Sequence, residues 1–270
     1  MDKLILAIIT LTITFSCSTR HDRTAELLMH AQELAEHNPR QALLFLDSIS
    51  SPENLEEQKY MQYIVIKTQA KYRDYKDIRN DSLILQAQKY FLENEKDPNL
   101  SALASFYAGS YYYENKDQLK QLECVISAKY YAHKAGNNLL EAKSAHIIGN
   151  IYAEKEMIDE AINNLKIALD RYGKNSNVNI YHIEVLRYLT LSNYIKNSID
   201  STIYYYDQGI EFARINNLTD YVITFTHLRG MIYEKQNDFK SAIDYYTSAY
   251  NSTKNPEEAR RINLGLLSLR

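Results

Sequence analysis

Short polar segments divide the apolar pattern of this chain into stretches of helix length. The breaks inside successive pairs of stretches are HNP at 37–39, YKDIRND at 75–81, ENKD at 114–117, EKEM at 154–157, KNS at 196–198 and EKQND at 234–238. No stretch shows sustained alternation of apolar and polar residues, so the pattern predicts helices and no sheet. The seven glycines and four prolines fall almost only in the breaks or at one repeated position, as expected for an all-helical protein.

The repeated position recurs about every forty residues. Gly109, Gly149 and Gly230 each precede a tyrosine by three residues, and Thr190 falls at the same register between them. The steps are 149 − 109 = 40, 190 − 149 = 41 and 230 − 190 = 40. A fixed period of about 20–50 residues with small residues in phase is the signature of a stacked-repeat solenoid. Further steps toward the N-terminus predict six helical pairs, phased at 30, 69, 109, 149, 190 and 230.

Small residues at these positions have a mechanical role. Two antiparallel helices approach to about 8 Å only where neither presents a bulky side chain at the crossing. Twelve and nineteen residues after two of the glycines come alanines, on the second helix of the pair. We therefore assign the packing of the repeats to Gly109, Gly149, Ala161, Ala168, Gly230, Ala242 and Ala249.

The segments 142–173 and 223–256 resemble tetratricopeptide repeats (TPRs). That family places a large residue, then Gly, then Tyr on its first helix, and Ala, an aromatic residue or Leu, and Ala on its second. The resemblance implies an all-α fold, a right-handed α–α superhelix of about six helical pairs over 25–254. The usual TPR period is about 34 residues, so the longer period implies helices about three residues longer. A period of 40 also suits HEAT-type repeats, but the Gly–Tyr–Ala–Ala phase favours the TPR.

The first seventeen residues predict export from the cytoplasm. Leu4–Ser16 is a run of thirteen residues without a charge (16 − 4 + 1 = 13). It is too short to span about 30 Å of hydrocarbon as a helix, and it suits the core of a signal peptide. The small residue before Cys17 resembles the lipobox of bacterial lipoproteins. The resemblance implies a signal peptide at 1–16, lipid on Cys17 and a polar tether at 17–24. The alternatives are an ordinary secretory signal or a short N-terminal anchor.

Composition and motifs narrow the function further. After Cys17 no apolar run approaches about 20 residues, so no further membrane span is predicted. The net charge is −3, and Lys and Arg are spread evenly along the chain. Because a nucleic-acid binder carries a cluster of basic residues, we expect no nucleic-acid partner. Cys124 is then the only other thiol, and we expect it to be a small buried hydrophobe. Since no HExxH, Cys/His, GxSxG, P-loop or GxGxxG motif occurs, we expect no enzyme activity, no metal and no cofactor.

The TPR resemblance also implies where a ligand binds. In that family ligands lie in a groove lined by the first helices, at six and three residues before the packing glycine and at one, four and five after it. Those positions give the groove candidates Phe106, Tyr113, Lys143, His146, Asn150, Arg187, Tyr194 and His227. Aromatic and cationic side chains of this kind suit an extended peptide with acidic or aromatic side chains. The alternative is that several of them pack against neighbouring first helices.

These observations predict a lipid-anchored scaffold that binds an unidentified protein or peptide and catalyses nothing. It would face the periplasm in the bacterial cell envelope, anchored to the outer membrane. Residues 255–270 are predicted to form a short leucine-rich helix that caps the last repeat. One alternative is a sensor module of a signalling protein without its output domain, since some larger proteins carry such a domain after a similar array. An enzyme with a site assembled across repeats is the third class.

Overall fold

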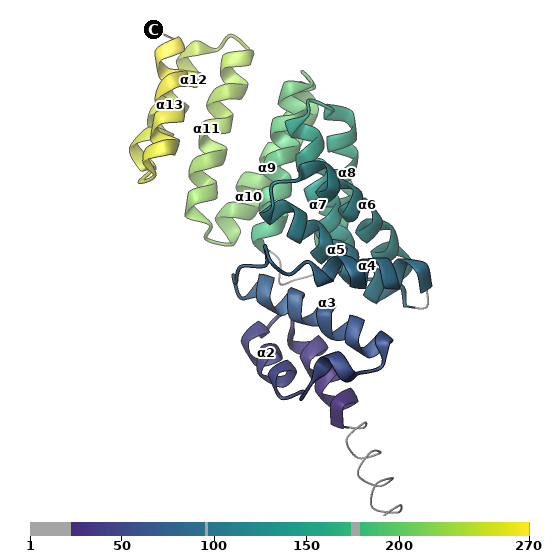
Figure 1. Cartoon of the computed structure of the whole chain (residues 1–270). Coiled ribbons are helices and arrows are strands. Elements are labelled where there is room, and N and C mark those ends of the chain that lie inside the picture. The colour runs from purple at the N-terminus through teal and green to yellow at the C-terminus, as the bar shows by residue number, and fades with distance from the viewer. Residues whose placement is uncertain (1–22, 95–96, 174–178, 270) are drawn as a thin grey trace, which may run out of the picture. The chain divides into compact units, whose positions relative to one another are not determined.

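The computed structural model describes residues 23–94, 97–173 and 179–269. Within these ranges every regular element is a helix, as Figure 1 shows, so the predicted all-α class is confirmed. The predicted signal peptide, Cys17 and most of the predicted tether lie outside the described residues. Residues 23 and 24, which were predicted to belong to the tether, are already helical.

The chain forms two compact units, Met1–Asn137 and Asn138–Arg270. The described part of the first unit contains a helix over 23–34, α2 (Pro39–Asp47), the short 3-10 helix η1 (Pro52–Asn54), α3 (Glu57–Arg73), α4 (Leu83–Asn94), α5 (Pro98–Glu114) and α6 (Gln118–Lys134). The second unit contains α7 (Asn138–Glu154), α8 (Ile158–Gly173), α9 (Asn179–Ile195), α10 (Ile199–Ile215), α11 (Thr219–Lys235), α12 (Phe239–Ser252) and α13 (Pro256–Ser268).

The helices pack in consecutive pairs, as the repeat predicts. The packing positions 69, 109, 149, 190 and 230 fall in α3, α5, α7, α9 and α11, which are the first helices of their pairs. Each of these five helices is 17 residues long. Because a 17-residue helix has almost five turns, two such helices and their connections account for a period longer than that of the TPR.

The same turn joins the two helices of four pairs. The second residue after the end of each first helix adopts the left-handed conformation, with φ between 61° and 64°: Lys116, Glu156, Asn197 and Asn237. The next N–H then donates to the carbonyl five residues back, as Asp117 N does to Tyr112 O at 2.9 Å. This is the Schellman motif, which ends a helix and satisfies its last carbonyl groups. In three of the four turns the accepting carbonyl belongs to the tyrosine of the repeat.

The glycines of the repeat lie where the paired helices approach most closely. A Cβ added to Gly149 would lie 2.7 Å from Leu165 Cγ, and one added to Gly230 would lie 2.4 Å from Tyr246 Cδ1. Either distance is well below van der Waals contact, so only glycine fits without a shift of the neighbouring side chain. A Cβ added to Gly209 would lie 2.1 Å from Phe225 Cζ, a further close approach that the sequence analysis did not assign.

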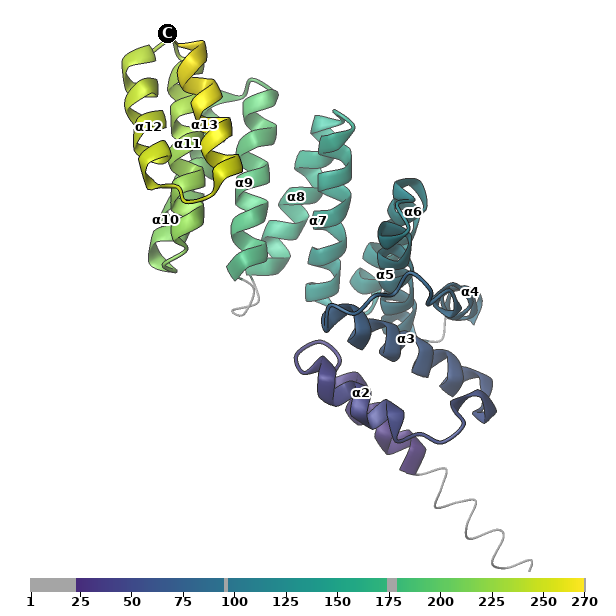
Figure 2. The same ribbon diagram turned by 60° about the vertical axis from the view of Figure 1, so that its left-hand side comes forward.

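The last helix covers the end of the second unit. Figure 2 shows α13 beside α11 and α12. Ile262 of α13 is buried in one cluster with Ala242, Tyr246 and Ala249 of α12. Leu266 and Leu269 pack against the same cluster. The N-terminal turns of α13 point side chains toward α11, and this arrangement positions the pocket described next.

Candidate ligand-binding pocket

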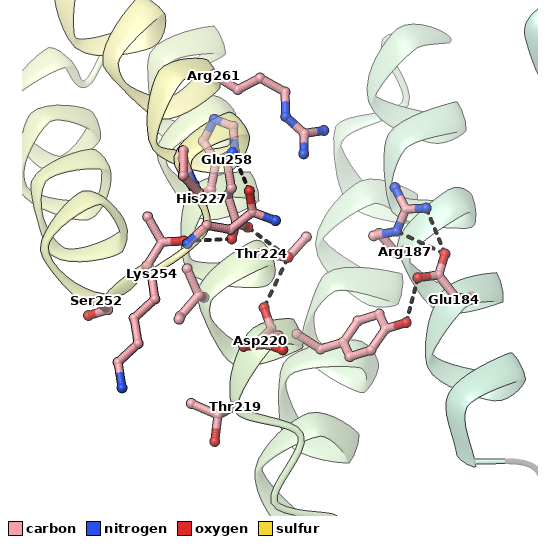
Figure 3. A pocket seen from close by; sticks show the side chains of 15 residues that line it. Glu184, Arg187, Thr219, Asp220, Thr224, His227, Ser252, Lys254, Glu258 and Arg261 are labelled. Carbon is pink, nitrogen blue, oxygen red and sulfur yellow. Dashed lines mark hydrogen bonds and ion pairs between the residues drawn. The ribbon is translucent and has the colours of Figure 1, made fainter.

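A pocket of about 940 Å³ lies in the second unit, on the face formed by successive first helices. Its walls come from α9, α11, the connection 253–255 and the beginning of α13 (Figure 3). The residues that matter for its chemistry are Glu184, Arg187, Asp220, Tyr221, Thr224, His227, Thr253, Lys254, Asn255, Glu258 and Arg261.

Helical periodicity brings these side chains to one face. The residues five positions after the first residue of α7, α9, α11 and α13 form one row. They are Lys143 (143 − 138 = 5), Glu184 (184 − 179 = 5), Thr224 (224 − 219 = 5) and Arg261 (261 − 256 = 5). Three residues further on, a second row contains His146, Arg187 and His227. Residues three apart lie on the same side of a helix, so the stacked first helices of this unit present two parallel rows of polar side chains.

The carboxylate of Glu184 is fully occupied by its neighbours. Arg187 donates to Glu184 Oε2 from Nε at 3.1 Å and from Nη2 at 2.6 Å. The hydroxyl of Tyr221 donates to Glu184 Oε1 at 2.5 Å and so connects α11 to α9. Burial and the hydrogen bond to Glu184 raise the pKa of Tyr221, which therefore stays protonated and keeps its donor. Glu184 thus fixes two neighbours and has little capacity left for a ligand.

Glu258 has the same role between α11 and α13. Thr224 Oγ1 lies 3.0 Å from Glu258 Oε1, and Thr253 Oγ1 donates to Glu258 Oε2 at 2.9 Å. Asn255 caps α13, since its Oδ1 accepts from the N–H of Glu257 at 3.0 Å and from that of Glu258 at 3.4 Å. A carboxylate near the N-terminus of a helix is also favoured by the helix dipole. The start of α13 is therefore held firmly against α11.

Two cations of the pocket have no such partner. Arg261 and Lys254 are exposed, and within the described part of the chain neither makes a hydrogen bond or an ion pair. Figure 3 shows Arg261 extending from α13 toward the α9 side of the pocket. The carboxylate residue Asp220 also lines the pocket, at the N-terminal end of α11. The pocket therefore has cationic groups on its α13 side that are available to a ligand.

His227 supplies a neutral aromatic wall. Its ring lies 5.4 Å from the ring of Tyr246, centroid to centroid. Tyr246 is itself fixed, because its hydroxyl donates to Glu234 Oε2 at 2.5 Å. Burial lowers the pKa of His227, so the imidazole is uncharged at neutral pH. It can accept or donate one hydrogen bond to a ligand and stack against an aromatic side chain.

His146 and Asn150 form a second polar feature of the same unit, on α7. The His146 ring lies 5.9 Å from that of Tyr188 on α9 and 6.2 Å from that of Tyr172 on α8. His146 Nε2 and Asn150 Oδ1 are buried, and no hydrogen bond reaches either atom from the described residues. Burial lowers the pKa of His146 to about 4. His146 is therefore a neutral, packed side chain.

The structure places the other sequence candidates apart from the pocket. Tyr194 lies near the C-terminal end of α9, where Lys235 donates to its carbonyl oxygen and holds Nζ 4.2 Å from its ring centroid. Lys143 is buried in the α7 row, and Phe106 is buried in the first unit, in agreement with the packing alternative. Tyr113 is exposed on α5. Of the eight groove candidates the pocket brings together Arg187 and His227.

Several pocket residues were missed by the sequence reasoning. Glu184 and Thr224 lie six residues before the packing positions 190 and 230, so the spacing rule that selected Lys143 also selects them. Arg261 and Glu258 were missed because α13 carries no glycine in phase with the repeat and was treated only as a cap. Their position five and two residues after the start of α13 is the signal that identifies them.

No group of His, Cys, Asp and Glu side chains within the described ranges is arranged to hold a metal ion. Among the same residues, no helix is both long and apolar enough to cross a membrane. Cys124 is buried, as expected, and burial raises the pKa of its thiol.

Comparison with known proteins identifies the fold. No family model and no curated protein matches the sequence. The apo form of RapI superposes with a TM-score of 0.67 at 11% sequence identity, covering 91% of this chain and 70% of RapI. BtubC (BKLC) from P. vanneervenii superposes with a TM-score of 0.56 at 16% identity, covering 92% of each chain. At such low identities the similarity shows the fold alone, and it confirms the predicted TPR-like helical-repeat fold.

Proposed function

We propose that this chain is a non-catalytic scaffold that binds an extended segment of another protein along the first-helix face of its second unit. We further propose that lipid on Cys17 anchors it to the outer membrane, facing the periplasm. The sequence and the pocket support different parts of this proposal.

The observation that carries the binding function is the distribution of charge in the pocket. Glu184 and Glu258 are occupied by hydrogen bonds from their neighbours, whereas Arg261 and Lys254 have no partner among the described residues. A ligand therefore finds cations free on the α13 side, beside the aromatic ring of His227. The volume of about 940 Å³ lies within the usual range of ligand sites, about 300–1,000 Å³. These features favour a peptide that carries a carboxylate near an aromatic side chain.

Arg261 and its neighbour Arg260 provide a matched test. Both are exposed on α13, but only Arg261 lines the pocket. The tagged chain, Arg261→Ala and Arg260→Ala would each be used to recover proteins from an envelope extract, followed by mass spectrometry. We expect a partner to be retained by the parent and by Arg260→Ala, and to be reduced about tenfold with Arg261→Ala, as for a charged contact of about 1.4 kcal/mol. Equal recovery with all three chains would contradict the pocket assignment.

The membrane anchor is supported by the uncharged run before Cys17. Each acyl chain contributes about 0.8 kcal/mol per buried methylene, and stable anchoring requires two chains or an equivalent second signal. Cells labelled with a clickable fatty acid should show label on the parent and none on Cys17→Ser. Equal labelling of the two proteins would mean that Cys17 is not the acylated residue.

The non-catalytic part of the proposal is supported by the sequence, which lacks motifs with catalytic spacing. It is tested by incubating the purified chain with generic esterase, glycosidase and peptidase substrates. Turnover that is lost in His146→Ala would contradict it.

A further inference from the structure

The connection between α3 and α4 is longer than its equivalents in the other pairs. Three residues join the helices of four pairs, at 115–117, 155–157, 196–198 and 236–238. Nine residues, 74–82, join α3 to α4, and we call this segment the α3–α4 loop. The six additional residues lie in the first unit, well separated in sequence from the pocket of the second unit. The other four pairs close their turns without them.

Tyr75 has an unusual conformation at the start of this loop. It adopts the left-handed conformation with φ 56°, and the next N–H donates to Lys71 O at 2.9 Å, so it occupies the left-handed position of the Schellman turn. The equivalent residues in the other turns are Lys116, Glu156, Asn197 and Asn237. Asn tolerates this conformation, whereas a bulky side chain is disfavoured in it.

The ring of Tyr75 does not contribute to the packing of the fold. The side chain is 98% exposed, more than any other large hydrophobic residue of the described chain. An exposed aromatic ring gains no burial energy. Neither backbone preference nor packing accounts for tyrosine here, and side chains that break local rules without a folding benefit are expected at functional sites.

The loop nevertheless has a fixed structure. Ile78, in the middle of the loop, is completely buried. Lys71 of α3 forms an ion pair with Asp81 at the far end of the loop. Asn115 Nδ2, from the end of α5, donates to the carbonyl of Arg79 at 3.3 Å. A surface ordered in advance loses less conformational entropy when it binds a partner. Tyr75 is therefore displayed by a rigid support.

The charges next to Tyr75 are unbalanced. Arg40 Nε lies 2.8 Å from Asp74 Oδ1, and Lys76 Nζ lies 3.4 Å from Asp74 Oδ2. The side chain of Asp74 is 11% exposed, whereas that of Arg40 is 86% exposed. Two cations thus share one largely covered carboxylate and leave one positive charge in excess at the surface. Further along the loop, Arg79 is neutralised by its own pair with Asp77.

We propose that the α3–α4 loop is a docking site for an acidic segment of a second protein, with Tyr75 as its central contact. Arg40 and Lys76 would pair with carboxylates of that segment. Tyr and Arg are the residue types that dominate binding energy at protein interfaces, and complementary charge gives such a contact its specificity. This site is independent of the pocket in the second unit.

The first test asks whether Tyr75 is present for the fold. Tyr75→Asn places a residue suited to the left-handed conformation at the same exposed position. We expect the melting temperature to stay equal to that of the parent or to rise by about 2–4 °C, as for relief of a local strain in a chain of this size. A lower melting temperature would show that the tyrosine stabilises the fold, and it would overturn the proposal.

The second test measures binding with a defined probe. A phage-displayed library of random peptides is selected on the full chain and counter-selected on Tyr75→Asn, which removes every peptide that binds elsewhere. We expect the remaining sequences to be enriched in Asp and Glu over the unselected library. The synthetic form of the best peptide should bind Tyr75→Asn and Lys76→Glu at least tenfold more weakly than the parent. Two exposed positions in the second unit, Tyr204→Asn and Lys240→Glu, serve as matched controls and should bind it unchanged.

Peptide selection and vesicle binding can each contradict the proposal. If no peptide survives counter-selection, or if the surviving peptides are not acidic, the loop does not bind an acidic segment. Sedimentation with phosphatidylglycerol vesicles provides the remaining comparison. Vesicle binding that is lost in Tyr75→Asn, without any Tyr75-dependent peptide, would assign the loop to a lipid surface and overturn the proposal.

Discussion

Glu184 and His146 show, at the scale of single residues, two ways in which this fold accommodates a polar side chain among first helices. Arg187 and Tyr221 donate hydrogen bonds to both carboxylate oxygens of Glu184. His146 has aromatic rings on two sides and no donor or acceptor for Nε2 among the described residues, so it is kept neutral.

The neutral state of His146 predicts a loss of stability in acid. Its pKa is about 4 in the folded chain, against 6.5 when unperturbed, so the unfolded chain binds a proton that the folded chain does not bind between these values. The contribution of the neutral His146 to the free energy of unfolding is therefore fully present above about pH 6.5, and it is lost as the pH falls toward 4. Between pH 7 and 4.5 the parent should lose about 2–3 kcal/mol more free energy of unfolding than His146→Phe. Urea unfolding at both pH values measures this difference, and His37→Phe, at an exposed position, is the control that should behave as the parent does.

Spacing within the repeat predicts which residues face the pocket but not which of them are free. The position three residues before the packing residue places Arg187 and His227 in the pocket, but His146, at the same position of α7, does not line it. Whether a charge is available depends on contacts between helices far apart in sequence, such as Tyr221 with Glu184 and Thr224 with Glu258. A single sequence carries no record of these partners, so the candidate site was only partly predictable.

At the scale of elements, the sequence predicts the helices well because glycine marks their crossings. Gly109, Gly149 and Gly230 recur with the repeat and lie at close approaches between the two helices of a pair. Gly209 lies instead between α10 and α11, against Phe225, at a position where the other pairs have no glycine. Its register is that of Ala168 and Ala249, because 209 − 190 = 19, but it was not assigned because Thr190 stands in place of the packing glycine of that pair. The length of the α3–α4 loop, in contrast, is visible in the long polar segment at 75–81.

The crossing at Gly149 is tested by adding a single methyl group. In Gly149→Ala the new Cβ would lie 2.7 Å from Leu165 Cγ and 3.3 Å from the Ala161 carbonyl oxygen. Overpacking of this kind costs about 1–3 kcal/mol, which exceeds the gain of about 1 kcal/mol that alanine brings to a helix. We expect a melting temperature several degrees below that of the parent. Gly173→Ala is the control, because no atom lies within 4 Å of its added Cβ. A Gly149→Ala chain as stable as the parent would show that the crossing is not tightly packed.

At the scale of the whole molecule, the period of about forty residues predicts a uniform array over 25–254, and nothing in the sequence marks a division within it. The structure nevertheless separates into Met1–Asn137 and Asn138–Arg270. The boundary falls within the segment AGNN at 135–138, which resembles the polar breaks elsewhere in the chain. The division into compact units depends on how many side chains make contact across each polar break. The residues of the break itself do not determine that number.

The second unit has what an independently folding fragment needs. Its core runs from Ala142 through Leu165, Leu189 and Phe225 to Ile232, and a further cluster joins α12 to α13. Repeat proteins are stabilised chiefly by interfaces between neighbouring elements, so removing distant pairs leaves the remaining interfaces intact. We expect the fragment 138–270 to be helical by circular dichroism and to melt in one cooperative transition.

The same fragment separates the two proposed binding sites. Because the pocket is lined only by residues of α9 to α13 and their connections, the fragment should recover the same partner as the full chain, and Arg261→Ala should reduce that recovery as it does in the full chain. It lacks the α3–α4 loop, so it should not bind a peptide selected through Tyr75. A cooperative fragment that recovers no partner, while the full chain does, would place the binding site in the first unit and show that the polar rows of α9, α11 and α13 serve only to hold the helices together.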